Sequence, residues 1–299
     1  MNAITIVFNI DGLTNIIHNG VCNDYNKCIK RIDTLTSKYP VLKDKLAVDK
    51  ATNCNNGVLQ VRDKNLNNTQ LTMVELNGVD LTGVNLTKAV LTYANLKGAI
   101  LTKVELEDAN LDDANLMMAT LKGANLKGAN LKGANLMSAN LKGANLEGAN
   151  LEDVMLTSCV LNGTCLKNTH INGCDLGGAN LMDADLTGVK IHGTWSYYTI
   201  FTNANMTNAY IKGGDLTGCN FENVTLKNAV LTGTEFCFCN LKKSDLRGAD
   251  LTGCDFGGAD LTDADLTDAN LEGANLENAT LKNTVLTGAN LKDAVFDAR

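Results

Sequence analysis

The sequence predicts an all-β solenoid preceded by a small N-terminal α+β domain. The main observation is that every fifth residue from Leu71 to Phe296 is apolar, 46 positions in all, with Ser196 as the one exception. The residue two places before each of these positions is always small. A period of five advances about 140° per repeat on a helix, and on a flat strand it sends successive leucines to opposite faces. The chain must therefore turn a corner in every repeat and wind around an axis filled with leucine.

Residues 1–60 lie outside this repeat and are expected to form the N-terminal domain, with the repeat domain at 61–299. Alternating apolar residues over 4–10 predict a strand. Apolar residues at helical spacing between Cys28 and Tyr39 predict a helix that Pro40 ends, and a second short helix is expected over 41–48. The domain is either a cap that covers the first coil or a separate binding or targeting module. A cap is favoured, because an uncovered sheet edge invites unwanted pairing.

The typical quintet reads Ala-Asn-Leu-Lys-Gly, as at 124–128 and 129–133, and over residues 69–298 the pattern resembles the pentapeptide-repeat family. The resemblance implies a right-handed parallel β-helix with a quadrilateral cross-section. Four quintets would make one coil, so residues 20 apart would stack and the array would hold about 11–12 coils. At roughly 4.8 Å per coil the rod would be about 55 Å long.

Each position of the quintet has an expected role. The leucine fills the axis, and the small residue also points inward because two large side chains would overpack it. The Asn or Asp between them is expected at a tight corner, where its side chain can bond nearby backbone groups. The frequent final Gly tolerates an unusual φ.

Composition excludes several classes of protein. The net charge is −7, and no apolar run is long enough to span a membrane. The first residues lack the basic region of a signal peptide, and the ten cysteines show no metal-binding spacing. We therefore expect a cytoplasmic protein with no membrane span, metal or other cofactor. Membership of a virion or another large assembly stays open.

One segment breaks the pattern at residues 194–198. It contains Trp195, Tyr197 and Tyr198 around the polar Ser196, and Phe238 falls in the same column as Tyr198. These four aromatic residues are candidate partner contacts, because clustered surface aromatics anchor interfaces. The alternative is a local bulge that swings Trp195 inward to replace the missing leucine. The sequence leaves both alternatives open.

Cysteine and histidine give no sign of catalysis. Five cysteines occupy the small inward position, where a free thiol packs well, and a disulfide between Cys219 and Cys239 is not favoured. His170 and His192 lie on one side without acidic or thiolate neighbours, so a metal site is not expected. No nucleophile–base arrangement is present, and a filled rod lacks a deep pocket. The sequence therefore argues against an enzyme.

The last coil is expected to associate with something. Only three residues follow Phe296, and an open β-helix end exposes unpaired backbone groups and the apolar axis. Phe296 is thus a candidate end contact, either with a second copy in an end-to-end homodimer or with another protein.

Two functions remain. The first is a non-enzymatic structural or interaction protein, a rigid rod that presents protein-binding faces. The second follows from the resemblance, because some pentapeptide-repeat proteins imitate DNA and inhibit gyrase. The repeat region is acidic, but its acids fall on all four faces, and Lys122, Lys127, Lys132 and Lys142 make its middle partly basic. We therefore favour the interaction protein, with no direct binding of nucleic acid. Opposite charges also alternate at coil spacing in two exposed ladders, which are expected to fix the register of the coils. The ladders are Glu107, Lys127, Glu147 and Asp112, Lys132, Glu152.

Overall fold

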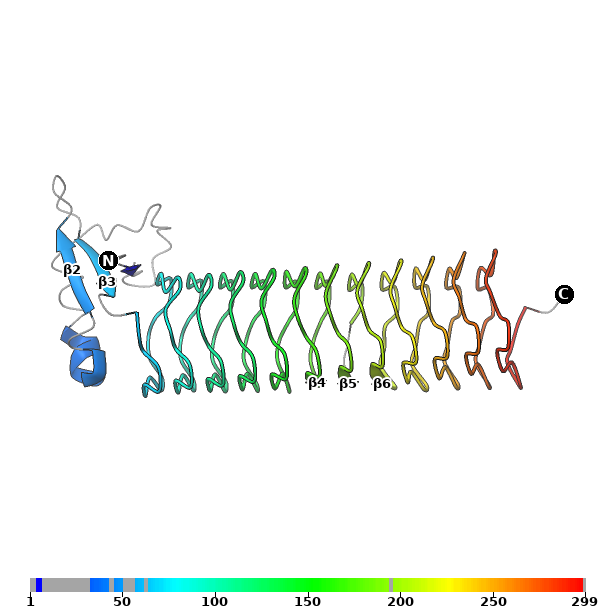
Figure 1. Cartoon of the computed structure of the whole chain (residues 1–299), viewed down its shortest axis with the longest axis horizontal. Coiled ribbons are helices and arrows are strands. Elements are labelled where there is room, and N and C mark those ends of the chain that lie inside the picture. The colour runs from blue at the N-terminus through cyan, green and yellow to red at the C-terminus, as the bar shows by residue number, and fades with distance from the viewer. Residues whose placement is uncertain are drawn as a thin grey trace.

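The computed structural model describes residues 4–6, 33–42, 46–50, 57–61, 64–193 and 196–297. From residue 64 the chain forms a rod of stacked coils (Figure 1). Parallel β-bridges join residues 20 apart, from Asn65–Asn85 to Asn275–Val295. One coil therefore takes four quintets, as expected. The first bridge lies one quintet before Leu71, so the repeat begins slightly earlier than the sequence indicated.

The backbone hydrogen bonds of a quintet explain why the coils stack. The leucine amide donates to the next coil, as Leu71 N does to Val90 O at 2.7 Å. The bridging residue donates back to the previous coil, as Val90 N does to Thr69 O at 2.9 Å. The small residue closes the corner, as Val74 N does to Leu71 O at 3.1 Å. Pairing between coils thus satisfies the backbone N–H and C=O groups, which would be unfavourable if buried without a partner.

The corner of each quintet falls at the two residues after the leucine. The second of them has a φ between 52° and 72° along the whole rod, which explains the frequent Gly there. The expectation that Asn or Asp forms the corner is wrong, because this residue bridges adjacent coils. Its side chain instead supports the corner from outside: Asp80 Oδ1 accepts a hydrogen bond from Thr82 N at 2.9 Å.

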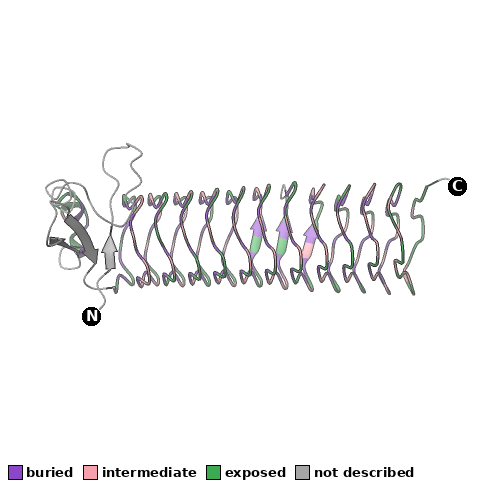
Figure 2. Ribbon diagram, turned by 90° about the horizontal axis from the view of Figure 1, so that it is seen from above, coloured by how far each residue is buried: buried purple, intermediate pink, exposed green. Residues whose placement is uncertain are grey.

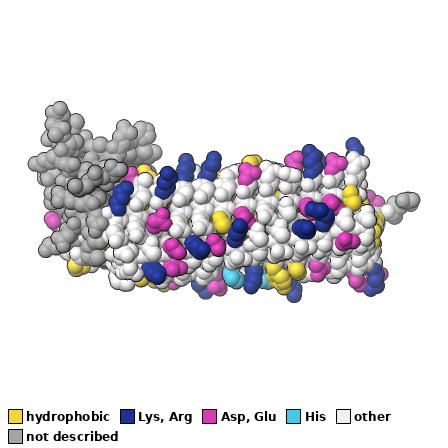
Figure 3. All heavy atoms as spheres, in the orientation of Figure 1, with side chains coloured by type: hydrophobic (Ala, Val, Ile, Leu, Met, Phe, Trp, Pro, Cys, Tyr) yellow, Lys and Arg dark blue, Asp and Glu magenta, His cyan; other side chains and the backbone are white. Residues whose placement is uncertain are grey.

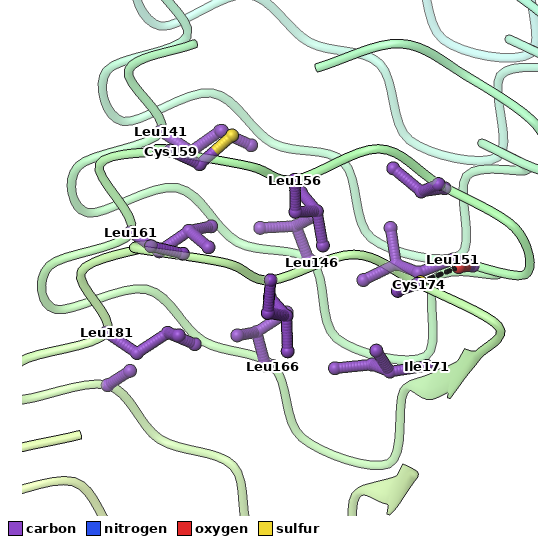
Figure 4. Close-up of a cluster of buried hydrophobic side chains, with 14 of the residues drawn as sticks. Leu141, Leu146, Leu151, Leu156, Cys159, Leu161, Leu166, Ile171, Cys174 and Leu181 are labelled. Carbon is purple, nitrogen blue, oxygen red and sulfur yellow. Dashed lines mark hydrogen bonds between the residues drawn. The ribbon is translucent and has the colours of Figure 1, made fainter. Parts of the chain in front are cut away.

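The axis is filled as the sequence predicts. Inward leucines form columns along the rod, for example Leu141, Leu161 and Leu181 (Figure 4). Buried and more exposed positions alternate around each coil before the last (Figure 2). Where phenylalanine replaces leucine, rings stack between coils, with centroids 4.8 Å apart for Phe201–Phe221 and 5.2 Å apart for Phe236–Phe256. The core is therefore continuous and leaves functional side chains only on the outside.

One corner differs in three successive coils. The strands β4 (His170–Asn172), β5 (Lys190–His192) and β6 (Tyr210–Lys212) pair in parallel there, where other coils have a two-residue turn. Each strand leads into the quintet that contains residue 175, 195 or 215. The irregular corner thus directly precedes the part of the rod where the aromatic segment lies.

The N-terminal region contains a small antiparallel sheet. Strands β1 (Ile4–Ile6), β2 (Leu46–Lys50) and β3 (Gly57–Val61) lie in the order β1-β3-β2. The predicted first strand is present over 4–6, and its remainder lies outside the described residues. The predicted helix over 41–48 is wrong, because η1 (Pro40–Leu42) and β2 occupy this stretch. Pairing with β3 decides the structure of β2, and local spacing could not reveal that partner.

Residues 33–38 are helical, and this segment contacts the rod. Leu35, Tyr39 and Leu42 are buried in the same hydrophobic cluster as Leu66 of the first coil. Tyr39 Oη donates a hydrogen bond to Thr72 O at 2.8 Å. These contacts join residues 33–42 to the first coil, and the choice between a cap and a separate module stays a prediction.

Candidate protein-binding side of the rod

Three residues of each quintet point outward, and they divide the rod into four sides. Each side lies between two corners and carries three columns of side chains, with residues 20 apart in one column. We name the acidic side the one built from residues 73, 75 and 77 and those every 20 further, up to 293, 295 and 297. None of its described residues is buried.

The acidic side holds ten acidic residues and one basic residue, Lys97, which gives a formal net charge of −9. Over the same residues, 64–297, the other three sides carry formal net charges of +1, −2 and −1 when taken in chain order. All four sides contain acids, as expected, but on three of them Lys and Arg offset the acids. The acids of the acidic side are Glu75, Asp113, Asp153, Asp175, Asp215, Glu235, Asp255, Glu277, Asp293 and Asp297.

Ion pairs show the same division. The predicted ladders contain the pairs Lys127–Glu147 at 3.4 Å and Lys132–Glu152 at 3.1 Å, both outside the acidic side. On the face of the rod that Figure 3 shows, acidic and basic side chains are intermingled. Among the described residues, the one ion pair that reaches the acidic side joins Lys292 to Asp293 at 3.7 Å. Asp175, Asp215, Glu235 and Asp255 on this side thus form no ion pair with a described residue.

Exposed apolar side chains gather in the same place. In the part of the rod that the structure describes before its last coil, eight large apolar residues are exposed. Seven lie on the acidic side or at the corner that ends it. The eighth, Ile100, lies in the column next to that corner. A bias of this kind is unusual for a solvated surface and typical of an interaction site. The seven are Met73, Tyr93, Met118, Met155, Tyr197, Tyr198 and Phe238.

Two of these residues lie on bare backbone. Tyr198 and Phe238 are 76% and 74% exposed and lie two coils apart at the corner that ends the acidic side. A Cβ built on Gly218 would come within 3.0 Å of the Tyr198 ring, and one on Gly258 within 2.8 Å of the Phe238 ring. Each ring therefore lies against a glycine of the next coil, which has no side chain to hold it away. We name residues 197–198, 217–218, 237–238 and 257–258 the aromatic corner.

Tyr197 links the aromatic corner to the carboxylates. Its hydroxyl hydrogen-bonds the Asp215 carboxylate, which raises the pKa of Tyr197. Partial burial acts to raise the pKa of Asp215, but hydrogen bonds from Tyr197 and Thr217 outweigh it, so that pKa is lowered. At neutral pH Asp215 is therefore charged and Tyr197 neutral.

Cys237 lies in the same column as Tyr197 and is half-buried. Burial, followed by the Asp255 carboxylate, raises the pKa of its thiol to about 11. The thiol is therefore protonated at neutral pH and is a poor nucleophile.

Ser196 occupies the leucine column as predicted and is fully buried. Among the described residues no group pairs with its Oγ. Trp195, the other half of the predicted defect, lies outside the described residues, so its two alternatives stay predictions. The next inward residue is Phe201, which is larger than the usual leucine.

The remaining described candidate residues, two cysteines and two histidines, form neither a disulfide nor a metal site. Cys219 and Cys239 are free thiols, and their Sγ atoms donate to Ser196 O and Leu216 O at 2.6 and 3.0 Å. His170 and His192 belong to β4 and β5 on another side of the rod. Within the described residues no group of His, Cys, Asp and Glu could hold a metal ion. No described helix is long and apolar enough to cross a membrane.

The last coil exposes the apolar axis. Phe296 is 41% exposed, and Val285, Leu291 and Val295 are also exposed. Phe296 shares a column with Phe236 and Phe256, but Leu276 lies between, so it does not join their stack.

This architecture is that of a β-helix repeat protein. The chain belongs to the pentapeptide-repeat family, whose model matches eight times over residues 65–195 and 198–297. A comparison with curated proteins found no match.

Several solved structures are similar to the chain. HetL of the cyanobacterium Nostoc sp. strain PCC 7120, involved in regulating heterocyst differentiation, is 27% identical over 79% of this chain and 92% of its own, with a TM-score of 0.41. Rfr23 of the cyanobacterium Cyanothece 51142 is 33% identical over 31% of this chain and 64% of its own, with a TM-score of 0.31. QnrB1, a plasmid-mediated fluoroquinolone resistance protein, is 22% identical over 61% of this chain and 89% of its own, with a TM-score of 0.39.

Proposed function

We propose that this protein is a non-enzymatic interaction rod, right-handed and four-sided, that binds protein partners along its acidic side. One observation carries the proposal: the largest net negative charge and most of the exposed large apolar side chains coincide on one side of the four and at the corner that ends it. Such a side offers both the charge that orients a partner and the apolar area that holds it. The free thiols of the described cysteines fit a cytoplasmic location.

Site-specific photocrosslinking in cells tests this proposal. A photoreactive amino acid at Thr217 would report on the acidic side, and one at Thr262, which is equally half-buried on the next side, is the matched control. We expect discrete adducts from position 217 and few from position 262. Equal labelling from both positions, or labelling only from 262, would contradict a dedicated binding side.

Inhibition of a type II topoisomerase by imitation of DNA is the second candidate function. The concentration of net negative charge on one side favours it, because a single charged stripe is what a DNA-binding groove would meet. The exposed aromatic residues on that side fit a polyanion mimic less well. A gyrase supercoiling assay separates the candidates: inhibition at micromolar protein would favour the second, and full supercoiling activity the first.

A further inference from the structure

We propose that the aromatic corner binds an extended, arginine-rich segment of a partner protein in polyproline II conformation, with arginine at every third position. This inference rests on the proposed function and names the chemistry of the partner. Three properties of the corner carry it: the placement of the rings, the row of carboxylates parallel to them and the distance between the rings.

Both rings are exposed to solvent, and each is restricted by its contact with a glycine. Tyr198 and Phe238 are exposed to a degree that is unusual for aromatic residues in an otherwise well-packed rod. Each lies against the glycine of the following coil, Gly218 or Gly258, so that contact restricts the ring while its other side stays open. An exposed ring that is already held loses little freedom when a ligand packs on it.

A row of carboxylates runs parallel to the rings, one column away, with Tyr197 and Cys237 in the column between them. Asp215, Glu235 and Asp255 occupy successive coils of one column, and none of them forms an ion pair with a described residue. Asp255 receives hydrogen bonds from Gly257 N at 2.8 Å and Asn275 Nδ2 at 2.9 Å, and Tyr197 bonds Asp215, so two of the three are already oriented. Arginine suits this surface because its guanidinium stacks on an aromatic face and binds a carboxylate through two hydrogen bonds. Lysine makes neither contact as well.

The distance between the rings selects the conformation of the ligand. Tyr198 and Phe238 lie two coils apart, or about 9.6 Å at the usual spacing of parallel strands. A polyproline II segment returns to the same face every three residues, about 9.3 Å. A β-strand returns every two residues, about 6.7 Å, and would leave one ring without a partner. Every third residue of a polyproline II segment along the corner would therefore meet a ring.

Peptide binding to the full-length protein tests this proposal. Two fluorescent peptides of identical composition would carry four arginines, one with arginine at every third position between prolines and the other with arginine at alternate positions. Their equal charge removes non-specific attraction as an explanation. We expect the first peptide to bind at least about threefold more tightly in fluorescence anisotropy, and a lysine version of it to bind more weakly than the arginine peptide.

Variants locate the site. Replacing both rings (Tyr198→Ser with Phe238→Ser) should weaken binding about tenfold, whereas the exposed ring elsewhere on the acidic side, Tyr93→Ser, should not. Gly258→Ala should also weaken binding by displacing the Phe238 ring. Gly98→Ala is its matched control: it lies in the same column with φ +64°, and an added Cβ there meets nothing within 4 Å. Equal effects of the two glycine variants would trace the loss to backbone strain and contradict the role of the ring.

Equal affinity for both arginine peptides, or unchanged affinity of the double-ring variant, would overturn this proposal. The proposed function would survive that result if position 217 still cross-linked a partner more efficiently than position 262. Loss of the preference between positions 217 and 262 would instead remove the proposed function itself.

Discussion

Ser196 is a polar residue in a column that is otherwise apolar, and its hydroxyl is buried with no partner among the described residues. Leaving a buried hydroxyl unpaired is unfavourable, and removing it relieves that cost. We expect Ser196→Ala to raise the free energy of unfolding by about 1 kcal/mol in urea denaturation.

Ser244 is the matched control for Ser196. It occupies the small inward position and is also buried, but its Oγ donates to Leu241 O at 2.7 Å. Ser244→Ala should therefore lower the free energy of unfolding by about 0.5–1.5 kcal/mol. A loss of stability in both variants would show that the Ser196 hydroxyl has a partner.

The raised pKa of the Cys237 thiol predicts how its rate of alkylation depends on pH. Because burial and Asp255 raise the pKa of its thiol to about 11, the thiolate fraction at pH 7.5 is small and grows about tenfold per pH unit below that value. Alkylation of Cys237 by iodoacetamide, followed by peptide mass spectrometry, should therefore be slow at pH 7.5 and accelerate steadily to about pH 10. Asp255→Asn should lower the pKa and speed the reaction at pH 8. A rate that is already at its maximum at pH 8 would contradict this assignment.

At the residue scale, the sequence was sufficient for the inward positions and less so for the outward ones. From residue 69 onward the period of five identifies every buried Leu and small residue, because burial repeats with the coil. It could not show that Asn and Asp bridge coils through their backbone and support the corner from outside, since a side chain that bonds nearby backbone groups fits either position. The ring contacts of Tyr198 and Phe238 were open to prediction, because the column positions of Gly218 and Gly258 follow from the period alone.

The element that repeats is the corner, and its constraint is a positive φ. Gly143 has φ +66°, and a Cβ added there would meet nothing within 4 Å, so a substitution tests backbone strain alone. Gly143→Val should cost about 1–3 kcal/mol of stability because a β-branched residue is strained in this region. Gly143→Asn should cost less than about 1 kcal/mol, since Asn223 already adopts φ 59° at the equivalent position. Thermal unfolding of both variants checks the order, and an equal loss would contradict the role of φ.

Elements outside the repeat were less predictable. The strand over 46–50 could not be recognised, because its structure depends on pairing with β3 rather than on local spacing. Likewise, the extended corner formed by β4, β5 and β6 follows from no single quintet. Repetition supplied the information for the rod, and where it stops the sequence contains much less.

At the scale of the whole molecule, the exposed last coil makes a prediction about assembly. Val285, Leu291, Val295 and Phe296 present apolar surface at one end of the rod. We expect this surface to associate two copies end to end, so the mass measured by light scattering should double between nanomolar and micromolar protein. Phe296→Asp should restore the monomer by placing a charge in that contact. A constant monomer mass for the unchanged protein would contradict self-association and favour a different partner.

The sequence contains the distribution of charge over the sides of the rod, but the total net charge does not reveal it. Acidic residues occur on all four sides of the rod. Only the net charge of each side, counted from its acidic and basic residues together, shows that one side is strongly negative. The most direct test of this side compares two variants of identical net charge. The first neutralises Asp175, Asp215, Glu235 and Asp255 to the corresponding amides. The second neutralises Glu105, Asp185, Asp245 and Asp265 at the same position of the quintet on another side.

Isothermal titration calorimetry of both variants with one arginine-rich peptide separates the effect of where the charge lies from the effect of how much charge there is. The interaction rod described above predicts that the first variant loses most of its affinity and that the second retains it. Equal losses in the two variants would show that the peptide responds only to total charge, and would contradict a dedicated binding side.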